Sequence, residues 1–191
     1  KTIRIFISFL LLFLFYNEIK SQQTVSFDNV RKDIDIAKEF YNKGKYVATL
    51  RQFEKIQKNL DKKSELYSEA EYYKSVSALH AGYNSGSKLM RTFIETHPES
   101  PYINSAWFNL GKNQFEKKQY TSAIRSFQNV DRNDLSEKDR IELQYQNGYA
   151  NMMEDNIDEA FIEFNAIKNT NNLYSKPATY YCAHILYLKE D

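Results

Sequence analysis

The stretch Ala106–Val130, AWFNLGKNQFEKKQYTSAIRSFQNV, decides the fold that this sequence predicts. Apolar residues recur in each of its halves at the spacing of one helix face. Two short helices that bury these faces against each other form a helix-turn-helix hairpin. Gly111 and Ala123 are small, so the two backbones can approach closely. Larger side chains are expected to be buried in the remaining space: Trp107, Leu110 and Phe127.

The same residues resemble the consensus of the tetratricopeptide repeat, W-x2-L-G-x2-Y followed by A-x3-F. The aromatic residue expected at Gln114 comes one position later, as Phe115. The resemblance implies an all-α fold that forms a right-handed superhelical solenoid. It also implies that the function of the protein is to bind a partner. The matching positions are Trp107, Leu110, Gly111, Ala123 and Phe127.

Three further segments align with this hairpin without gaps, at residues 31–56, 72–93 and 140–167. A turn is expected at Gly44 in the first and at residues 84–86 in the second. Residues 175–191 predict one more first helix, which gives about four and a half repeats. That helix is apolar, whereas repeat arrays usually close on a polar capping helix, so the chain is expected to continue beyond Asp191. The phenylalanines of the second helices are Phe53, Phe93, Phe127 and Phe164.

The N-terminus has the three-part layout of a secretory signal peptide. Lys1 and Arg4 precede twelve apolar residues, and the small residue Ser21 follows a polar stretch. The apolar run is too short to cross a bilayer comfortably, so no membrane span is expected after cleavage. The alternative is a buried helix of the mature fold. The predicted organisation is a signal peptide at residues 1–21, a leader at 22–30 and the repeat array at 31–191.

Composition excludes several classes of function. The chain has 26 basic and 25 acidic residues, so it carries no electrostatic footprint for nucleic acid. Cys182 is the one cysteine, which excludes an internal disulfide and a cysteine-rich metal site. No cysteine lies near the predicted cleavage point, so no lipid-anchored N-terminus is expected.

No motif in the sequence predicts catalysis, a cofactor or a metal site. The three histidines, His80, His97 and His184, lack the spacing of a zinc site. Residues 82–88 depart from the phosphate-binding loop in spacing and order, and an inter-helix turn explains them better. The acidic cluster at residues 154–159 suits a turn and a helix start, where carboxylates favour the helix dipole. The sequence therefore predicts a protein that is not an enzyme.

A set of mostly aromatic positions on the first helices is the predicted partner-binding surface. In the repeat family such positions line a concave groove, where rigid rings would hold an extended peptide or a partner helix. The alternative is that the rings pack between neighbouring repeats. Phe115, Tyr145 and Tyr149 are the preferred candidates. The full set is Tyr41, Lys74, Phe108, Lys112, Phe115, Tyr145, Tyr149, Tyr180 and His184.

The segment Thr92–Leu110, TFIETHPESPYINSAWFNL, resembles the joint between hairpins in periplasmic members of the family, namely the cell-division coordinator and the BamD-type outer-membrane assembly lipoproteins. This resemblance implies a scaffold or adaptor in the bacterial envelope that binds a protein partner in an outer-membrane assembly, secretion or cell-wall complex. Two alternatives stay open. The repeats could be the targeting arm of an enzyme or receptor with an active domain after Asp191, or a glycan-binding module.

Overall fold

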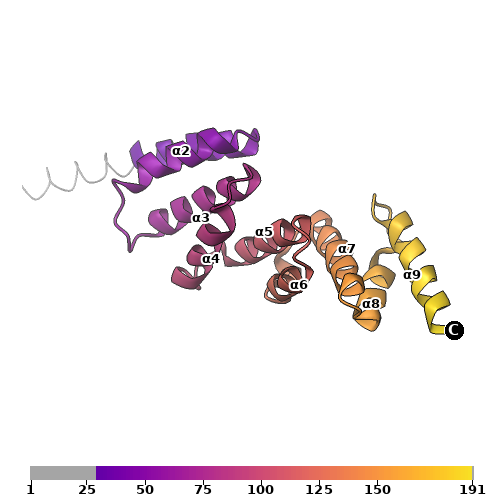
Figure 1. Cartoon of the computed structure of the whole chain (residues 1–191). Coiled ribbons are helices and arrows are strands. Elements are labelled where there is room, and N and C mark those ends of the chain that lie inside the picture. The colour runs from indigo at the N-terminus through magenta and orange to yellow at the C-terminus, as the bar shows by residue number, and fades with distance from the viewer. Residues whose placement is uncertain (1–28, 191) are drawn as a thin grey trace, which may run out of the picture. The chain divides into compact units, whose positions relative to one another are not determined.

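The computed structural model describes residues 29–190, and every regular element in that range is a helix (Figure 1). The predicted all-α class is thus confirmed for this range. The predicted signal peptide, residues 1–21, lies outside the described residues. After a first helix at residues 29–42 the elements are α2 (Tyr46–Gln57), α3 (Glu65–His80), α4 (Gly86–Thr96), α5 (Ile103–Glu116), α6 (Tyr120–Gln128), the 3-10 helix η1 (Arg132–Asp134), α7 (Glu137–Met153), α8 (Ile157–Ile167) and α9 (Ser175–Glu190).

The chain divides into two compact units, and the division falls within α3, between Lys74 and Ser75. In the N-terminal unit the first helix and α2 form a hairpin that packs against the start of α3. The first helix already includes residues 29 and 30, which the sequence assigned to the leader, because Val30 packs against this core. The buried residues of the core are Ile34, Ala37, Phe53, Ile56, Leu66 and Ala70.

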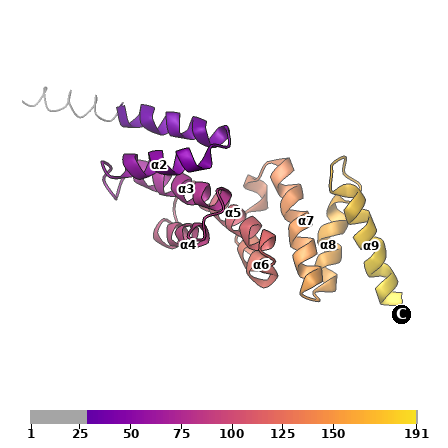
Figure 2. The same cartoon turned by 45° about the horizontal axis from the view of Figure 1, so that its top comes forward.

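In the C-terminal unit each helix from α4 to α9 packs against the next one along the chain (Figure 2). Two of the cores in this unit show the consequence of this order. One is built around Phe127, between α5, α6 and α7, and the other around Phe164, between α7, α8 and α9. A side-chain cap marks the start of α7, whereas α2, α4, α5, α6 and α8 begin without one. The Ser136 hydroxyl accepts the backbone N–H of Asp139 at 3.1 Å at the start of α7, and Pro101 comes just before α5.

The same turn joins the two helices of all four hairpins. At the end of α5, Lys118 has a φ of 58° and donates its N–H to Phe115 O, while Gln119 donates to Gln114 O, both at 2.8 Å. This pair of bonds is the Schellman motif, which satisfies the last carbonyls of a helix. Equivalent bonds with a positive φ occur at Gly44, Gly82 and Asp155.

The turn predicted at Gly44 is confirmed, and the one predicted at residues 84–86 is confirmed in part, because the connection between the helices spans residues 81–85. The left-handed residue of the second hairpin is Gly82, and Gly86 is already the first residue of α4. Gly86 is needed there for a different reason. A Cβ at this position would lie 2.8 Å from the backbone nitrogen of Leu79, so the glycine lets α4 start directly against the end of α3.

A small residue faces a buried phenylalanine in the hairpins of the C-terminal unit. A Cβ on Gly111 would lie 2.5 Å from the ring of Phe127, and one on Gly148 would lie 3.1 Å from that of Phe164. The sixteen-residue spacing of these pairs recurs in the earlier hairpins, where all four residues are also buried. The four segments therefore share a repeat-like helical architecture. The earlier pairs are Ala37 with Phe53 and Ser77 with Phe93.

Candidate functional site

The nine predicted groove residues are divided between the two compact units of the chain. Tyr41 and Lys74 belong to the N-terminal unit and the other seven to the C-terminal unit. Tyr41 is half-buried, with edge-to-face contacts to Tyr46 at 5.6 Å and Tyr73 at 5.4 Å between ring centroids. Burial and these two neighbours raise the pKa of Tyr41 to about 12. Lys74 donates a hydrogen bond of 2.7 Å to Gln57 Oε1. Both residues are thus engaged within their own unit.

Phe108 and Lys112, on α5, are also engaged in internal contacts. Phe108 was expected on the surface, but it is 6% exposed and packs in the core around Phe127. The physical reason is that α7 follows closely enough to cover this face of α5. Lys112 lies over the Phe108 ring, 5.1 Å from its centroid, and its Nζ is 2.7 Å from Glu142 Oε1.

The three preferred candidates lie in one continuous row of rings that joins α5, α7 and α9. Phe115 meets Tyr149 edge to face at 5.8 Å, and Tyr149 meets Tyr181 at 5.8 Å. Tyr145 stacks on Tyr174 at 4.6 Å, and its ring centroid lies 6.5 Å from that of Tyr181. All five rings are partly buried, as expected for packing between neighbouring hairpins, which was the alternative to binding.

Tyr181 is the ring where this row meets α9. Burial, together with the nearby Tyr145 and Tyr149, raises the pKa of Tyr181 to about 12. Its ring stacks on the buried Phe164 at 4.9 Å. The sequence did not single out Tyr181 as a groove residue, although it occupies the centre of the aromatic row.

Tyr180 and His184 are the two predicted residues that remain well exposed. Tyr180 is 65% exposed, and His184 stacks beside it with an interplanar angle of 5°. They stand one turn apart on α9, where Tyr187 is a third exposed side chain, 64% accessible. This face of α9 presents aromatic surface to solvent.

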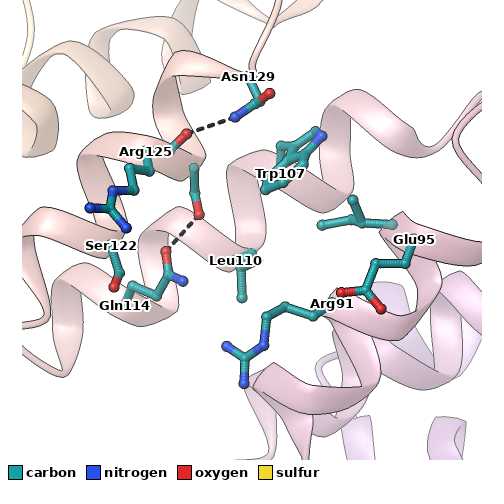
Figure 3. A pocket seen from close by; sticks show the side chains of 10 residues that line it. Arg91, Glu95, Trp107, Leu110, Gln114, Ser122, Arg125 and Asn129 are labelled. Atoms are coloured by element: carbon teal, nitrogen blue, oxygen red, sulfur yellow. Dashed lines mark hydrogen bonds between the residues drawn. The ribbon is translucent and has the colours of Figure 1, made fainter.

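A pocket that the sequence did not predict lies between α4, α5 and α6 (Figure 3). Its volume is about 330 Å³. Leu110, 1% exposed, and Ile94, 8% exposed, are its most deeply buried apolar side chains, and Trp107 adds an aromatic wall. Trp107 was expected to be buried, but it is partly exposed because it borders this pocket. The remaining lining residues are Arg91, Glu95, Gln114, Ser122, Arg125, Ser126 and Asn129.

Three of the polar side chains in the pocket are held by hydrogen bonds. Ser126 Oγ donates to Gln114 Oε1 at 2.7 Å, and Asn129 Nδ2 donates to the carbonyl oxygen of Arg125 at 2.8 Å. The guanidinium groups of Arg91 and Arg125 form no ion pair with any carboxylate of the described residues. These residues come from three helices, so no local sequence pattern indicates that they meet.

Between residues 29 and 190, no three His, Cys, Asp or Glu side chains are grouped in a way that could hold a metal ion. In that range no helix combines the length and the apolar character needed to span a membrane. No model of a known protein family matches the chain, and no curated protein matches it either.

Proposed function

We propose that this chain is a non-catalytic scaffold that binds a protein partner, built from tetratricopeptide-type hairpins in a right-handed solenoid. The observation that carries the proposal is the recurrence of one hairpin design. Four hairpins share the Schellman turn and the spacing of a small residue to a buried phenylalanine. Repeats of this kind stack into extended surfaces that are used for binding.

The exposed face of α9 is the part of the predicted groove that can reach a partner. Tyr180 and His184 stack on each other and leave their outer faces in solvent, with Tyr187 one turn further on. Rigid aromatic side chains give a large contact area at a low cost in conformational entropy, and they dominate many interfaces. Phe115, Tyr145 and Tyr149 stabilise the packing of α5, α7 and α9 against one another.

The proposed location is the bacterial envelope. Support comes from the signal-peptide layout of residues 1–21 and from the resemblance of the Thr92–Leu110 joint to periplasmic repeat proteins. In the structure this joint consists of the end of α4, a turn that holds Pro98 and Pro101, and the start of α5. Fractionation of expressing cells, with sequencing of the mature N-terminus, is expected to place the protein in the periplasm with Gln22 as its first residue.

Cross-linking in intact cells followed by affinity purification tests the binding role. The chain is expected to enrich one or a few envelope proteins, and the double variant Tyr180→Ala/His184→Ala is expected to lose them. Ile162→Ala is the matched control, because Ile162 is an exposed apolar residue on α8, 67% accessible. Equal enrichment by the double variant and the control would rule out α9 as the binding face. Failure to enrich any envelope protein would contradict the scaffold proposal itself.

A further inference from the structure

The pocket between α4, α5 and α6 has a size that selects its occupant. A volume of about 330 Å³ is near the lower end of the range of ligand sites. It has room for one or two side chains and for the backbone that carries them, but not for a packed helix. Trp107, Leu110 and Ile94 give it an apolar interior, which suits an aliphatic or aromatic side chain.

The charges around this interior favour a negatively charged partner. Arg91 extends from α4 and Arg125 from α6, and Glu95 is the one acidic residue among the lining residues. An arginine guanidinium matches a carboxylate in shape and can donate two parallel hydrogen bonds to it. Neither arginine has an acidic partner among the described residues, so both are available to an incoming group.

Gln114 adds a neutral donor between the two arginines. Its Oε1 accepts from the buried Ser126 hydroxyl, which fixes the orientation of the amide. The Nε2 donors are then left for an occupant, because none of the described groups accepts from them. In Figure 3 Gln114 lies between the guanidinium groups of Arg91 and Arg125, with Leu110 beside it.

We infer that this pocket binds an acidic segment of another protein, with one apolar side chain held against Leu110 and Trp107 and flanking carboxylates held by Arg91 and Arg125. The segment is extended, because the pocket is too small for a helix. This inference goes beyond the proposed function, since it uses α4, α5 and α6 and none of the α9 residues assigned there. The two proposals can therefore fail separately.

Trp107 provides a direct probe, because it is the single tryptophan of the chain and lines the pocket. The test peptide has one leucine flanked on each side by two aspartates and is blocked at both ends. Titration is expected to change the Trp107 fluorescence in a saturable way. A peptide with asparagines in place of the aspartates is expected to bind more weakly by about fivefold or more, since it loses the charge interactions.

Variants locate the binding. Arg91→Ala and Arg125→Ala are each expected to weaken binding of the aspartate peptide by about fivefold. Arg140→Ala is the matched control, because Arg140 is an exposed arginine on α7 outside the pocket. The double variant Arg91→Glu/Arg125→Glu is expected to prefer a peptide with lysines in place of the aspartates. All these positions are exposed, so the fold is expected to persist, which circular dichroism checks.

Three outcomes would overturn the inference. The first is equal binding of the aspartate and asparagine peptides. The second is an affinity of Arg91→Ala and Arg125→Ala that matches that of Arg140→Ala. The third is the absence of any fluorescence change with peptide. A charge-reversed variant that gains the lysine peptide would support the inference even if the original affinity is weak.

Discussion

Gly111 on α5 lies so close to Phe127 on α6 that a methyl group at the glycine would sit 2.5 Å from Cε1 of the ring. Gly148 on α7 and Phe164 on α8 repeat this relationship with a looser fit of 3.1 Å. Both phenylalanines are fully buried. The closest approach of the helices within a hairpin therefore depends on a missing side chain.

Gly111→Ala is expected to destabilise the protein by about 1–2 kcal/mol, because overpacking costs about 1–3 kcal/mol and a better helix residue returns up to about 1 kcal/mol. Gly148→Ala serves as the matched comparison and is expected to be nearly neutral, since its neighbours need to shift by a few tenths of an ångström. Urea denaturation measures both. A larger loss at Gly148 would mean that the two hairpins are not packed as described.

Phe127→Ala is expected to cost about 3–5 kcal/mol, because it empties a fully buried site at the centre of a core. Trp107→Ala is expected to cost less, since Trp107 is partly exposed at the pocket. Thermal and urea unfolding of the two variants give the comparison. The opposite order would show that Trp107, rather than Phe127, fills the space between the helices.

Arg132→Ala is expected to destabilise the C-terminal unit by about 2 kcal/mol. Glu163 is 7% exposed and accepts hydrogen bonds from Arg132 Nη1 at 3.0 Å and from Asn147 Nδ2 at 2.7 Å. Removing the arginine leaves a buried carboxylate without its charge partner, which costs several kcal/mol when both groups are buried and less here, because Arg132 is 38% exposed.

Lys43→Ala is the control for this ion pair, since Lys43 and Glu39 are both well exposed at 60% and 68%. It is expected to change stability by about 0.5 kcal/mol or less. The added change Glu163→Gln is expected to recover part of the loss in Arg132→Ala, because it removes the unpaired charge. A double variant that is less stable than Arg132→Ala alone would contradict this account.

His80 is expected to make stability depend on pH on the acidic side of neutrality. Partial desolvation of the imidazole and the nearby Lys112 lower the pKa of His80 below its ordinary value of 6.5, although the residue is partly open to solvent, and Glu116 and Asn109 oppose them in part. The unfolded chain therefore takes up a proton first as the pH falls. The stabilising contribution is complete above pH 6.5 and is lost progressively below it.

Denaturation at a series of pH values, with His80→Gln as the comparison, measures this effect. The native protein is expected to lose more stability than the variant between pH 7.5 and 5.5. An NMR titration of His80 with a midpoint above 6.5 would reverse the sign and refute the prediction.

Cys182 is expected to be protected from thiol reagents in the folded protein. It is 3% exposed on α9, and burial raises its pKa, with a smaller opposing effect of Lys168. Alkylation by iodoacetamide is expected to be slower by about two orders of magnitude than in the urea-unfolded chain. Because Cys182 packs in the core between α8 and α9, a fast native reaction would show that α9 detaches readily.

Much of the fold could be predicted because a hairpin is a local structure. Within each hairpin the apolar positions, the small residue and the phenylalanine lie close together in the sequence, so their order in the chain predicts the two helices and their register. The turn at Asp155 was expected from the acidic cluster at residues 154–159, whereas the position of the turn at Lys118 was less visible. In both turns the left-handed residue is not glycine. There the hydrogen bonds of the Schellman motif offset the steric cost of a positive φ at a residue that has a Cβ atom.

The sequence by itself determined that the described chain is helical, where each hairpin lies and which phenylalanines fill it. Only the tertiary structure decided which aromatic residues reach solvent, because exposure depends on the next hairpin. Tyr145 and Tyr180 each lie on the helix that begins a repeat. Tyr174 and Tyr181 cover the ring of Tyr145, whereas the ring of Tyr180 is exposed to solvent. The pocket could not be predicted from the sequence for the same reason, because Arg91, Trp107 and Arg125 come together only when three helices pack against one another.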